Sequence, residues 1–262
     1  MPSSPEPALR RAIPELERLP RPLHARAERL RAGSWTARHR HPWGQLSYAI
    51  SGVLGVHTEG GSFFAPPHWA VWVPAGLEHE VITSTHADMR SLYVREDACG
   101  WAPARCQVLE VTPLTRELIK QFCLLPVDYP EADGPAARLV AVLLDQLAAA
   151  PEAGFSLPMP GDARIRGLCE ALLEQPDLDR TLGQWAPVLG ASEKTLSRAF
   201  QRDTGLTFRR WRQRLRLLAA LQPLERGDSV TRVALASGYE SPSAFIAAFR
   251  GLFGRTPGEL FR

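Results

Sequence analysis

Two histidines in the first part of the chain have the spacing of metal ligands. His39 and His41 stand two residues apart, so on an extended strand both imidazoles point to the same side. Gln45 follows four residues after His41, and His79 closes the segment PAGLEH further along. Imidazole nitrogens bind Zn, Ni, Fe and Mn. If tertiary structure brings these side chains together, metal coordination is the chemistry that their residue types favour.

The spacing around these histidines resembles the two sequence motifs of cupin barrels. The positions in step with the first motif are Gly33, His39, His41 and Gly52, and Gln45 stands where the family has Glu. The second motif is matched at its centre by Pro74, Gly76 and His79, whereas His68 and Thr83 replace its leading Gly and trailing Asn. The resemblance implies that the three histidines lie on neighbouring barrel strands. With Gln45, they would hold one divalent metal ion (Zn, Ni, Fe or Mn).

Gln45 leaves more than one interpretation open. A carboxylate would add charge and favour a hard divalent ion, whereas Gln45 offers only a neutral carbonyl oxygen. The substitution lowers the expected metal affinity, or it shifts the ligand to an organic molecule held by hydrogen bonds. The histidines of a cupin-shaped sensor could also hydrogen-bond only within the barrel. Four tryptophans crowd the same region, either as core residues or as stacking surfaces for a flat effector: Trp35, Trp43, Trp69 and Trp72.

A second set of polar residues recurs at helical spacing near the C-terminus. Lys194, Ser197, Arg198 and Gln201 are spaced i, i+3, i+4, i+7 and therefore share one helix face, opposite the apolar Leu196, Ala199 and Phe200. Ser192 is a candidate N-cap for this helix. Before it, the apolar face of Leu182–Leu189 ends at Gly190. Two short helices with a tight turn and a basic outer face indicate a helix-turn-helix.

The same arrangement returns further along the chain. Val230–Ala236 is a short apolar helix, Gly238 ends it, and Ser243–Phe253 is a second helix. We expect this second helix to turn Phe245, Ile246, Phe249 and Phe253 inward and to present Ser243, Ala244, Ala247 and Arg250 on its outer face. Between the copies, Thr207–Arg226 is predicted as one long amphipathic basic helix.

These two copies resemble the DNA-binding domain of AraC/XylS-type transcription regulators. The matching segments are GASEKTLSRAFQRDTGLTFRRWRQRLRL and VALASGYESPSAFIAAFRGLFGRTPGEL, and the resemblance covers roughly residues 163–262. It implies that the partners are double-stranded DNA, a small-molecule or metal effector, RNA polymerase and a second copy of the chain. Arg198 could grip a guanine and Gln201 an adenine or a phosphate. More plausible contacts to the DNA backbone are Arg202, Thr181, Arg209 and Arg210.

The elements that must position these residues predict a two-domain α+β protein. Residues 1–22 are predicted to be a mobile arm. Short alternating runs between Gly and Pro predict a cupin-like β-barrel over residues 23–110. Two helices, Thr112–Leu125 and Pro135–Ala149, fill residues 111–154, and in AraC-type regulators the equivalent region often pairs two subunits. Residues 155–162 form the linker, and residues 163–262 form an all-α domain with two helix-turn-helix motifs.

Composition agrees with DNA binding by the C-terminal domain. The net charge is +3, but from Gly161 onward 16 basic residues face 11 acidic ones, so that part carries +5 and the remainder −2. The four cysteines form no CxxC pair, which is typical of reduced thiols. No apolar run reaches the length of a membrane span, so we expect a cytoplasmic protein without membrane contacts.

We therefore predict a DNA-binding transcription regulator whose barrel senses a small molecule or metal ion. It is not expected to be an enzyme, since no further acid or base stands at a recognisable spacing. Two alternatives remain at this point. One is a metal-dependent cupin enzyme, and the other is a regulator whose ligand-free barrel serves only in dimerisation.

Overall fold

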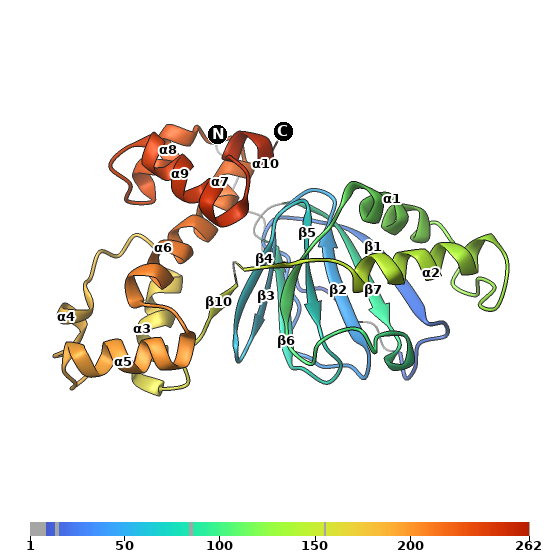
Figure 1. The fold of residues 1–262 in the computed structure, drawn as a ribbon, viewed down its shortest axis with the longest axis horizontal. Helices are drawn as coiled ribbons and strands as arrows, with labels where there is room; N and C mark the ends of the chain where they lie inside the picture. Colours follow the sequence, from blue (N-terminus) through green and yellow to red (C-terminus); the bar gives the residue numbers. More distant parts are fainter. Residues whose placement is uncertain (1–8, 14–15, 84–85, 155, 262) are drawn as a thin grey trace. The chain divides into compact units, whose positions relative to one another are not determined.

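The structure is a computed structural model that describes residues 9–13, 16–83, 86–154 and 156–261. The chain divides into two compact units (Figure 1). The first contains the described chain up to Thr58 together with Phe63–Gly154, and the second contains Glu59–Ser62 and the described chain after residue 155. An antiparallel β domain followed by an all-helical domain confirms the predicted fold class.

The strands form two antiparallel sheets, of which β10 and the first two residues of β4 belong to the second unit. The larger has the order β1-β7-β2-β5-β8-β9, and its strands are β1 (Leu23–Leu30), β7 (Ala87–Val94), β2 (Gly44–Ala49), β5 (Trp69–Val73), β8 (Gln107–Glu110) and β9 (Glu152–Ala153). The smaller has the order β10-β4-β3-β6, with β10 (Leu157–Pro158), β4 (Gly61–Ala65), β3 (Leu54–Thr58) and β6 (His79–Thr83). A single turn of 3-10 helix, η1 (Glu96–Ala98), follows β7.

The larger sheet has one apolar and one polar face. On β2, Leu46 and Tyr48 belong to the main hydrophobic core, whereas Gln45 and Ser47 hydrogen-bond to each other on the opposite side. This division follows from the strand geometry, in which successive side chains point to opposite faces. The sheet therefore buries its core on one side and lines the domain interior with polar groups on the other.

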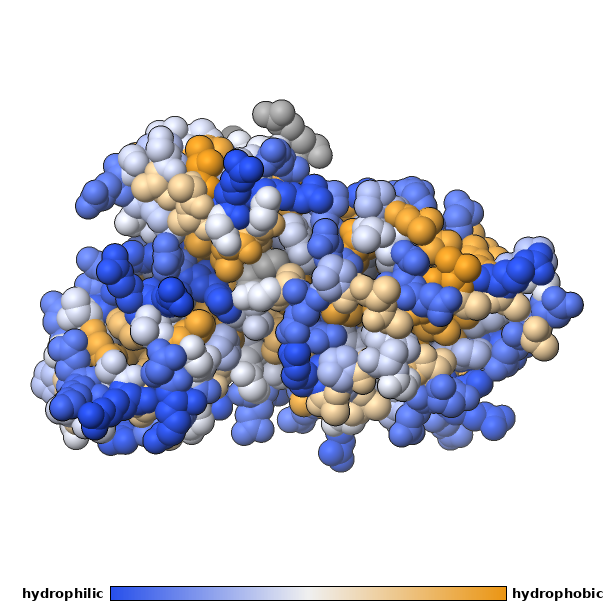
Figure 2. All heavy atoms as spheres, viewed as in Figure 1, coloured by the Kyte–Doolittle hydropathy of each residue, from blue (hydrophilic) through white to orange (hydrophobic). Residues whose placement is uncertain are grey.

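The two helices that the sequence predicted are present, and they cover the apolar face. They are α1 (Pro113–Phe122) and α2 (Pro135–Ala148). The hydroxyl of Thr112 caps α1 by accepting from the backbone N–H of Thr115, and Pro113 occupies the first helical position. Ile119 and Leu143 are fully buried in the core that these helices share with the sheet. Figure 2 shows apolar side chains gathered over α1 and α2, and the exposed Leu114 and Val142 belong to these helices.

The described part of the predicted mobile arm lies against the β domain. The backbone N–H of Arg11 donates to the carbonyl of Trp35 at 2.7 Å, and the guanidinium of Arg11 forms a buried ion pair with Glu28. Leu19 is buried against Trp43. Tertiary contacts therefore order these residues, although their sequence is rich in Pro and Arg.

The second unit is helical and contains both predicted helix-turn-helix motifs. Its helices are α3 (Ala163–Glu174), α4 (Leu182–Trp185), α5 (Glu193–Thr204), α6 (Phe208–Ala219), α7 (Leu221–Glu225), α8 (Val230–Ala236), α9 (Pro242–Phe253) and α10 (Pro257–Leu260). The hydroxyl of Ser192 caps α5 as expected, and Gly190 and Gly238 both have positive φ angles in the turns that precede the second helix of each motif. A linker residue also belongs to this unit, since the indole N–H of Trp211 donates to the carbonyl of Pro158 at 2.7 Å.

Three local predictions need correction. The long helix expected over Thr207–Arg226 is divided into α6 and α7, because Pro223 lacks the N–H for a helical bond and its ring clashes with the carbonyl of Ala219. Ile246 is half-buried rather than inward, since Phe245 and Phe249 fill the core. His39 and His41 lie in an irregular extended segment rather than on a regular strand.

Candidate functional site

The three histidines singled out by the sequence lie together inside the β domain. Their candidate ligand nitrogens all stand within 4.8 Å of one another. The ring centroids of His39 and His79 are 4.3 Å apart, and those of His41 and His79 are 5.1 Å apart. His79 is fully buried, His41 is nearly so, and His39 is half-buried. Among the described residues, no other group of His, Cys, Asp or Glu side chains has this metal-ligand arrangement.

A short backbone ladder places the cluster. The N–H of His39 donates to the carbonyl of His79, the N–H of His79 donates back to His39, and both bonds are 2.9 Å long. The carbonyl of His41 accepts from the N–H of Gly76 at 2.9 Å, which ties the first segment to the turn before β6. Gly76 has a φ of 75°, a conformation that favours glycine. The ladder therefore joins residues that are far apart in the sequence.

Each ring is oriented by a hydrogen bond from Nδ1 to a backbone carbonyl. The acceptor is Ala37 for His39 at 2.9 Å, Trp43 for His41 at 2.8 Å and Leu77 for His79 at 2.9 Å. A carbonyl oxygen only accepts, so Nδ1 carries the proton in all three rings. The neutral rings therefore present Nε2 lone pairs, which is the tautomer that metal-binding histidines use when a carbonyl holds their other nitrogen.

Burial keeps the cluster uncharged. Desolvation lowers the pKa of His39 and His41 below the ordinary histidine value, and it lowers the pKa of His79 to about 3. Nearby His39 and His41 lower the pKa of His79 further, because like charges repel. Near neutral pH the three rings therefore offer lone pairs rather than protons, as metal ligands must.

The buried Nε2 of His79 tests whether the cluster fits a metal ion. In the part of the chain that the structure describes, this nitrogen has no hydrogen-bond partner. An unpaired buried nitrogen costs free energy, so a native structure usually gives it a ligand or a water molecule. The orphaned nitrogen and the two neighbouring lone pairs fit a divalent metal ion. His39, His41 and His79 are the residues that would hold it.

Gln45 has a different role in this structure from that of a fourth ligand. In the structure its Oε1 lies 2.8 Å from His41 Nε2, and its Nε2 donates to the Ser47 hydroxyl oxygen at 2.8 Å. Neutral His41 cannot donate from Nε2 as well as from Nδ1. The neutral ring is therefore satisfied only with the amide turned over by 180°, an orientation assigned from its hydrogen bonds: the nitrogen of Gln45 then donates to Nε2, and its oxygen accepts from Ser47. Gln45 thus occupies the lone pair that a metal would need from His41.

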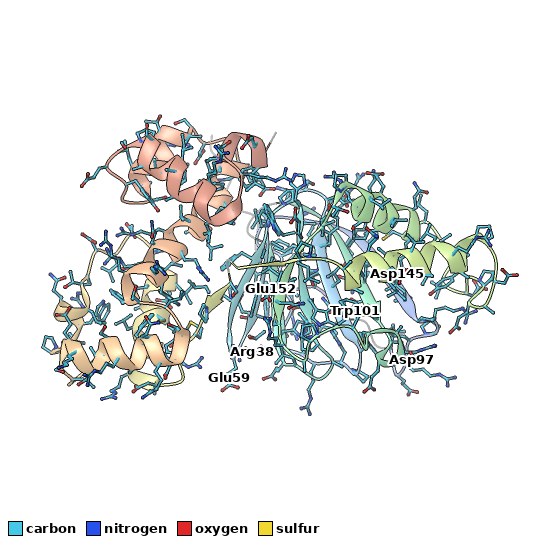
Figure 3. All side chains as sticks on the ribbon, in the orientation of Figure 1. Arg38, Glu59, Asp97, Trp101, Asp145 and Glu152 are labelled. Carbon is cyan, nitrogen blue, oxygen red and sulfur yellow. The ribbon has the colours of Figure 1, made fainter. Side chains whose placement is uncertain are left out.

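Two aromatic rings lie against the histidine cluster, and one of them belongs to a tryptophan that the sequence left as a core or stacking candidate. The Trp43 ring stacks on His41 with a centroid separation of 5.3 Å, and Tyr93 meets His41 edge-on at 6.0 Å. Trp69 and Trp72 are buried core residues. The ring centroid of Trp72 lies 5.1 Å from that of Trp101, which is labelled in Figure 3. Sequence reasoning did not single out Tyr93, because its role depends on the register of β7 beside β2.

The outer face of α5 is open to solvent as predicted. The five residues expected to read or contact DNA from this helix are all exposed: Lys194, Ser197, Arg198, Gln201 and Arg202. Gln201 donates its amide to the carbonyl of Gly205 at 2.9 Å, and Arg202 pairs with Asp203 at 2.7 Å. These contacts hold Gln201 and Arg202 at the end of the helix. Within the described chain, Lys194, Ser197 and Arg198 have no such partner and are available to a ligand.

The outer face of α9 is exposed and shallowly hollowed. Ser243, Ala244, Ala247 and Arg250 are all exposed, as predicted. An open groove on this face is lined by Ser243, Ala247 and Arg250. Ile246, which was predicted to lie in the core, lines it as well. The spacing of the apolar residues does not show whether Ile246 is buried or exposed, because Ile246 lies at the edge of the buried stripe of Phe245 and Phe249. The face offers one cation, one hydroxyl and otherwise methyl groups.

A β domain with a cluster of ligand-type residues, followed by a basic domain with two helix-turn-helix motifs, is the organisation of a transcription regulator with a ligand-binding domain. Residues 24–175 match the family described as the AraC-like ligand binding domain, and residues 185–262 match a helix-turn-helix domain family. The chain belongs to the AraC family of transcriptional regulators. In the part that the structure describes, no helix is long and apolar enough to cross a membrane.

The chain is also similar to individual proteins. Over 220 residues the chain is 37% identical to the HTH-type transcriptional regulator NimR of Escherichia coli. The aligned region covers 84% of this chain and 80% of NimR. It is 32% identical over 100 residues to the HTH-type transcriptional regulator RipA of Corynebacterium glutamicum, covering 38% of this chain and 30% of RipA. A solved structure of ToxT from Vibrio cholerae aligns with 92% of this chain and 98% of its own at 9% identity, with a TM-score of 0.38.

The hydrogen bond between Gln45 and His41 can be tested in the metal-free protein. Gln45→Leu leaves His41 Nε2 and the Ser47 hydroxyl without their buried partner, so we expect the free energy of unfolding to fall by about 1–3 kcal/mol. Calorimetric unfolding in the presence of a chelator measures the change. Gln121→Leu, at an exposed position on α1, is the matched control and should leave stability nearly unchanged. Equal stability of the two variants would contradict the proposed hydrogen bond.

Proposed function

We propose that the β domain of this AraC-family regulator binds a divalent metal ion and that this ion controls DNA binding. The observation that supports the proposal best is the cluster of three neutral imidazoles with the orphaned Nε2 of His79 among them. Imidazole ligands suit Zn, Ni, Fe and Mn. Bound, the ion would supply positive charge inside a domain that otherwise holds only neutral rings there.

Metal binding gives the β domain a means of responding. Before His41 can donate its Nε2 lone pair to the ion, Gln45 must release it. Gln45 and Ser47 lie on β2, the strand whose other face carries Leu46 and Tyr48 of the core. If Gln45 exchanges its hydrogen-bond partner, the change occurs on a strand whose other face packs against α1 and α2. An organic effector held by hydrogen bonds in the same place would use the same polar groups.

Metal content and DNA affinity test this proposal together. The purified full-length protein should bind one divalent ion per chain, and His79→Gln should lower that affinity at least about tenfold, since even the loss of a hydrogen-bond partner of a ligand costs about that much. His86→Gln, an exposed histidine outside the cluster, is the matched control. Gln45→Glu should raise the affinity about tenfold, because it adds a charged ligand.

The outcomes separate the alternative functions. Absence of metal binding in the wild type, together with unchanged DNA affinity when metals are added, would overturn the metal sensor and leave a regulator with an organic effector or a ligand-free barrel. Turnover of an oxidisable substrate by the metal-loaded protein would instead support the cupin enzyme. We otherwise propose no catalytic activity, because the relatives are transcription regulators.

We further propose that α5 carries most of the sequence discrimination on DNA. Two reading helices that enter successive major grooves stand about 34 Å apart along the duplex. Lys194, Ser197 and Arg198 on α5 offer free donors, whereas the face of α9 offers mainly methyl groups and Arg250. Methyl groups can contact thymine, but they discriminate less than bidentate hydrogen bonds. Thr181, Arg209 and Arg210 are exposed and are the proposed contacts to phosphates.

Arg198 provides the test of base reading. Arg198→Ala should weaken binding to the preferred site by about 1–3 kcal/mol and relax the preference at one base position. Arg202→Ala, which removes a predicted phosphate contact from the same helix, should weaken binding to all sequences alike. Both variants are compared with the wild type by selection from a random DNA library at fixed salt. A uniform loss with Arg198→Ala would make Arg198 a phosphate contact instead.

The protein is proposed to act as a dimer in the cytoplasm, where a second copy packs on α1 and α2. Leu114 is 55% exposed and Val142 is 44% exposed on these helices, where Figure 2 shows apolar side chains. Val142→Glu should therefore dissociate the dimer, as measured by sedimentation of the full-length protein. Leu235→Glu, at an exposed apolar residue of α8, is the control and should not. RNA polymerase is the further partner that we propose for the DNA-bound form.

A further inference from the structure

The two helix-turn-helix motifs share one supporting helix, α6. Phe208 at its start and Trp211 one turn later contact the ring of Phe200 on α5, with centroids 5.6 and 5.8 Å apart. The other end of α6 packs against α9, which carries the second reading face. In Figure 1, α6 runs from the group of α3, α4 and α5 to the group of α7 to α10. The angle between the two reading helices therefore depends on how each motif is fixed to α6.

Beside α6 the two motifs are separated by a cleft of about 560 Å³. Thr181 and Ser197 of the first motif line one part of it, and Gly238 and Tyr239 of the second line another. A second cavity, of about 340 Å³, lies between α6 and α8. Arg216 borders both spaces.

Arg216 and Arg212 lie on one face of α6 and bind the segment that precedes the first motif. The guanidinium of Arg212 pairs with Asp179 at 2.5 Å and donates to the carbonyl of Arg180 at 2.8 Å. Arg216 donates to the same carboxylate at 3.4 Å and to the carbonyl of Pro176 at 3.4 Å. Both arginine side chains are largely buried, with 17% and 15% of their surface exposed, whereas the side chain of Asp179 is 79% exposed. The bonds from the planar guanidiniums to the backbone carbonyls are charge-assisted and directional, whereas water screens the pairs with the exposed carboxylate.

The same guanidinium lies against the turn of the second motif. A Cβ atom at Gly238 would stand 2.9 Å from Nη1 of Arg216 and 3.1 Å from Cζ, so a larger residue there would displace the guanidinium from this position. Gly238 also has a φ of 75°, which ends α8. Arg216 thus contacts Asp179 before the first motif and Gly238 inside the second.

We propose that Asp179, Arg212 and Arg216 form a clamp that fixes the relative orientation of the two motifs and so determines the spacing of DNA half-sites that the protein accepts. These residues are positioning residues, because their side chains are directed to the protein's own backbone and carboxylate. The clamp sets how far apart and at what rotation α5 and α9 meet the duplex. It leaves the choice of bases to the exposed faces of those helices.

The test measures affinity against half-site spacing. The wild-type full-length protein selects its preferred site from a random DNA library, and duplexes are then made with the spacing changed by one or two base pairs. We expect the wild type to lose about tenfold or more per base pair, because each step also rotates the second half-site around the duplex. Arg216→Ala should bind the preferred spacing about tenfold more weakly and the altered spacings nearly as well as the wild type does.

Two further variants separate the clamp from a loss of charge or of folding. Arg209→Ala removes the same charge from an exposed site on α6, so it should weaken binding by one factor at every spacing. Asp179→Asn keeps both arginines and should flatten the spacing preference as Arg216→Ala does. If circular dichroism shows that Arg216→Ala is unfolded, Asp179→Asn decides alone. A uniform loss with Arg216→Ala, or a wild-type spacing preference with Asp179→Asn, would overturn the proposal.

Discussion

The two faces of the larger sheet impose the constraint on which the β domain depends. One face must bury apolar side chains against α1 and α2, and the other must hold polar groups in a dry interior. Strand β2 meets both demands with the alternating series Gln45, Leu46, Ser47, Tyr48. A shift of one residue would exchange the two sets, so the apolar core also fixes the register that brings Gln45 to His41. The stability of the fold and the chemistry of its interior are thus set by the same strand.

The hydrogen bonds of the three histidines decide which of their nitrogens face the interior. The backbone carbonyls of Ala37, Trp43 and Leu77 take the three Nδ1 protons, and this leaves the opposite nitrogens of the rings facing one another. Gln45 satisfies one of these nitrogens, and the Nε2 of His79 is left over. The hydrogen bonds that hold the three rings in place therefore also turn their Nε2 lone pairs toward a common point, where a ligand could bind.

The helical domain solves a different problem, because two small motifs must act as one reading surface. Each motif buries its own apolar residues, such as Leu196 and Phe200 in the first and Phe245 and Phe249 in the second. Neither core by itself determines how the motifs face each other. That orientation comes from α6, whose apolar side packs on both motifs and whose arginines reach the segments around them. The residues proposed to contact the bases therefore differ from the residues that set the orientation of the two motifs.

By itself, the sequence determined the order of the domains, the two helix-turn-helix motifs, the exposed faces of α5 and α9, and the three histidines, because local periodicity and motif spacing carry that information. It could not determine where the Thr207–Arg226 helix divides, the side to which Ile246 turns, or the packing of residues 9–13. The hydrogen bonds of Gln45, the contact of Tyr93 with His41 and the approach of Arg216 to Gly238 were decided only by tertiary structure. Each depends on residues distant in the chain, whose meeting is set by sheet register and helix packing.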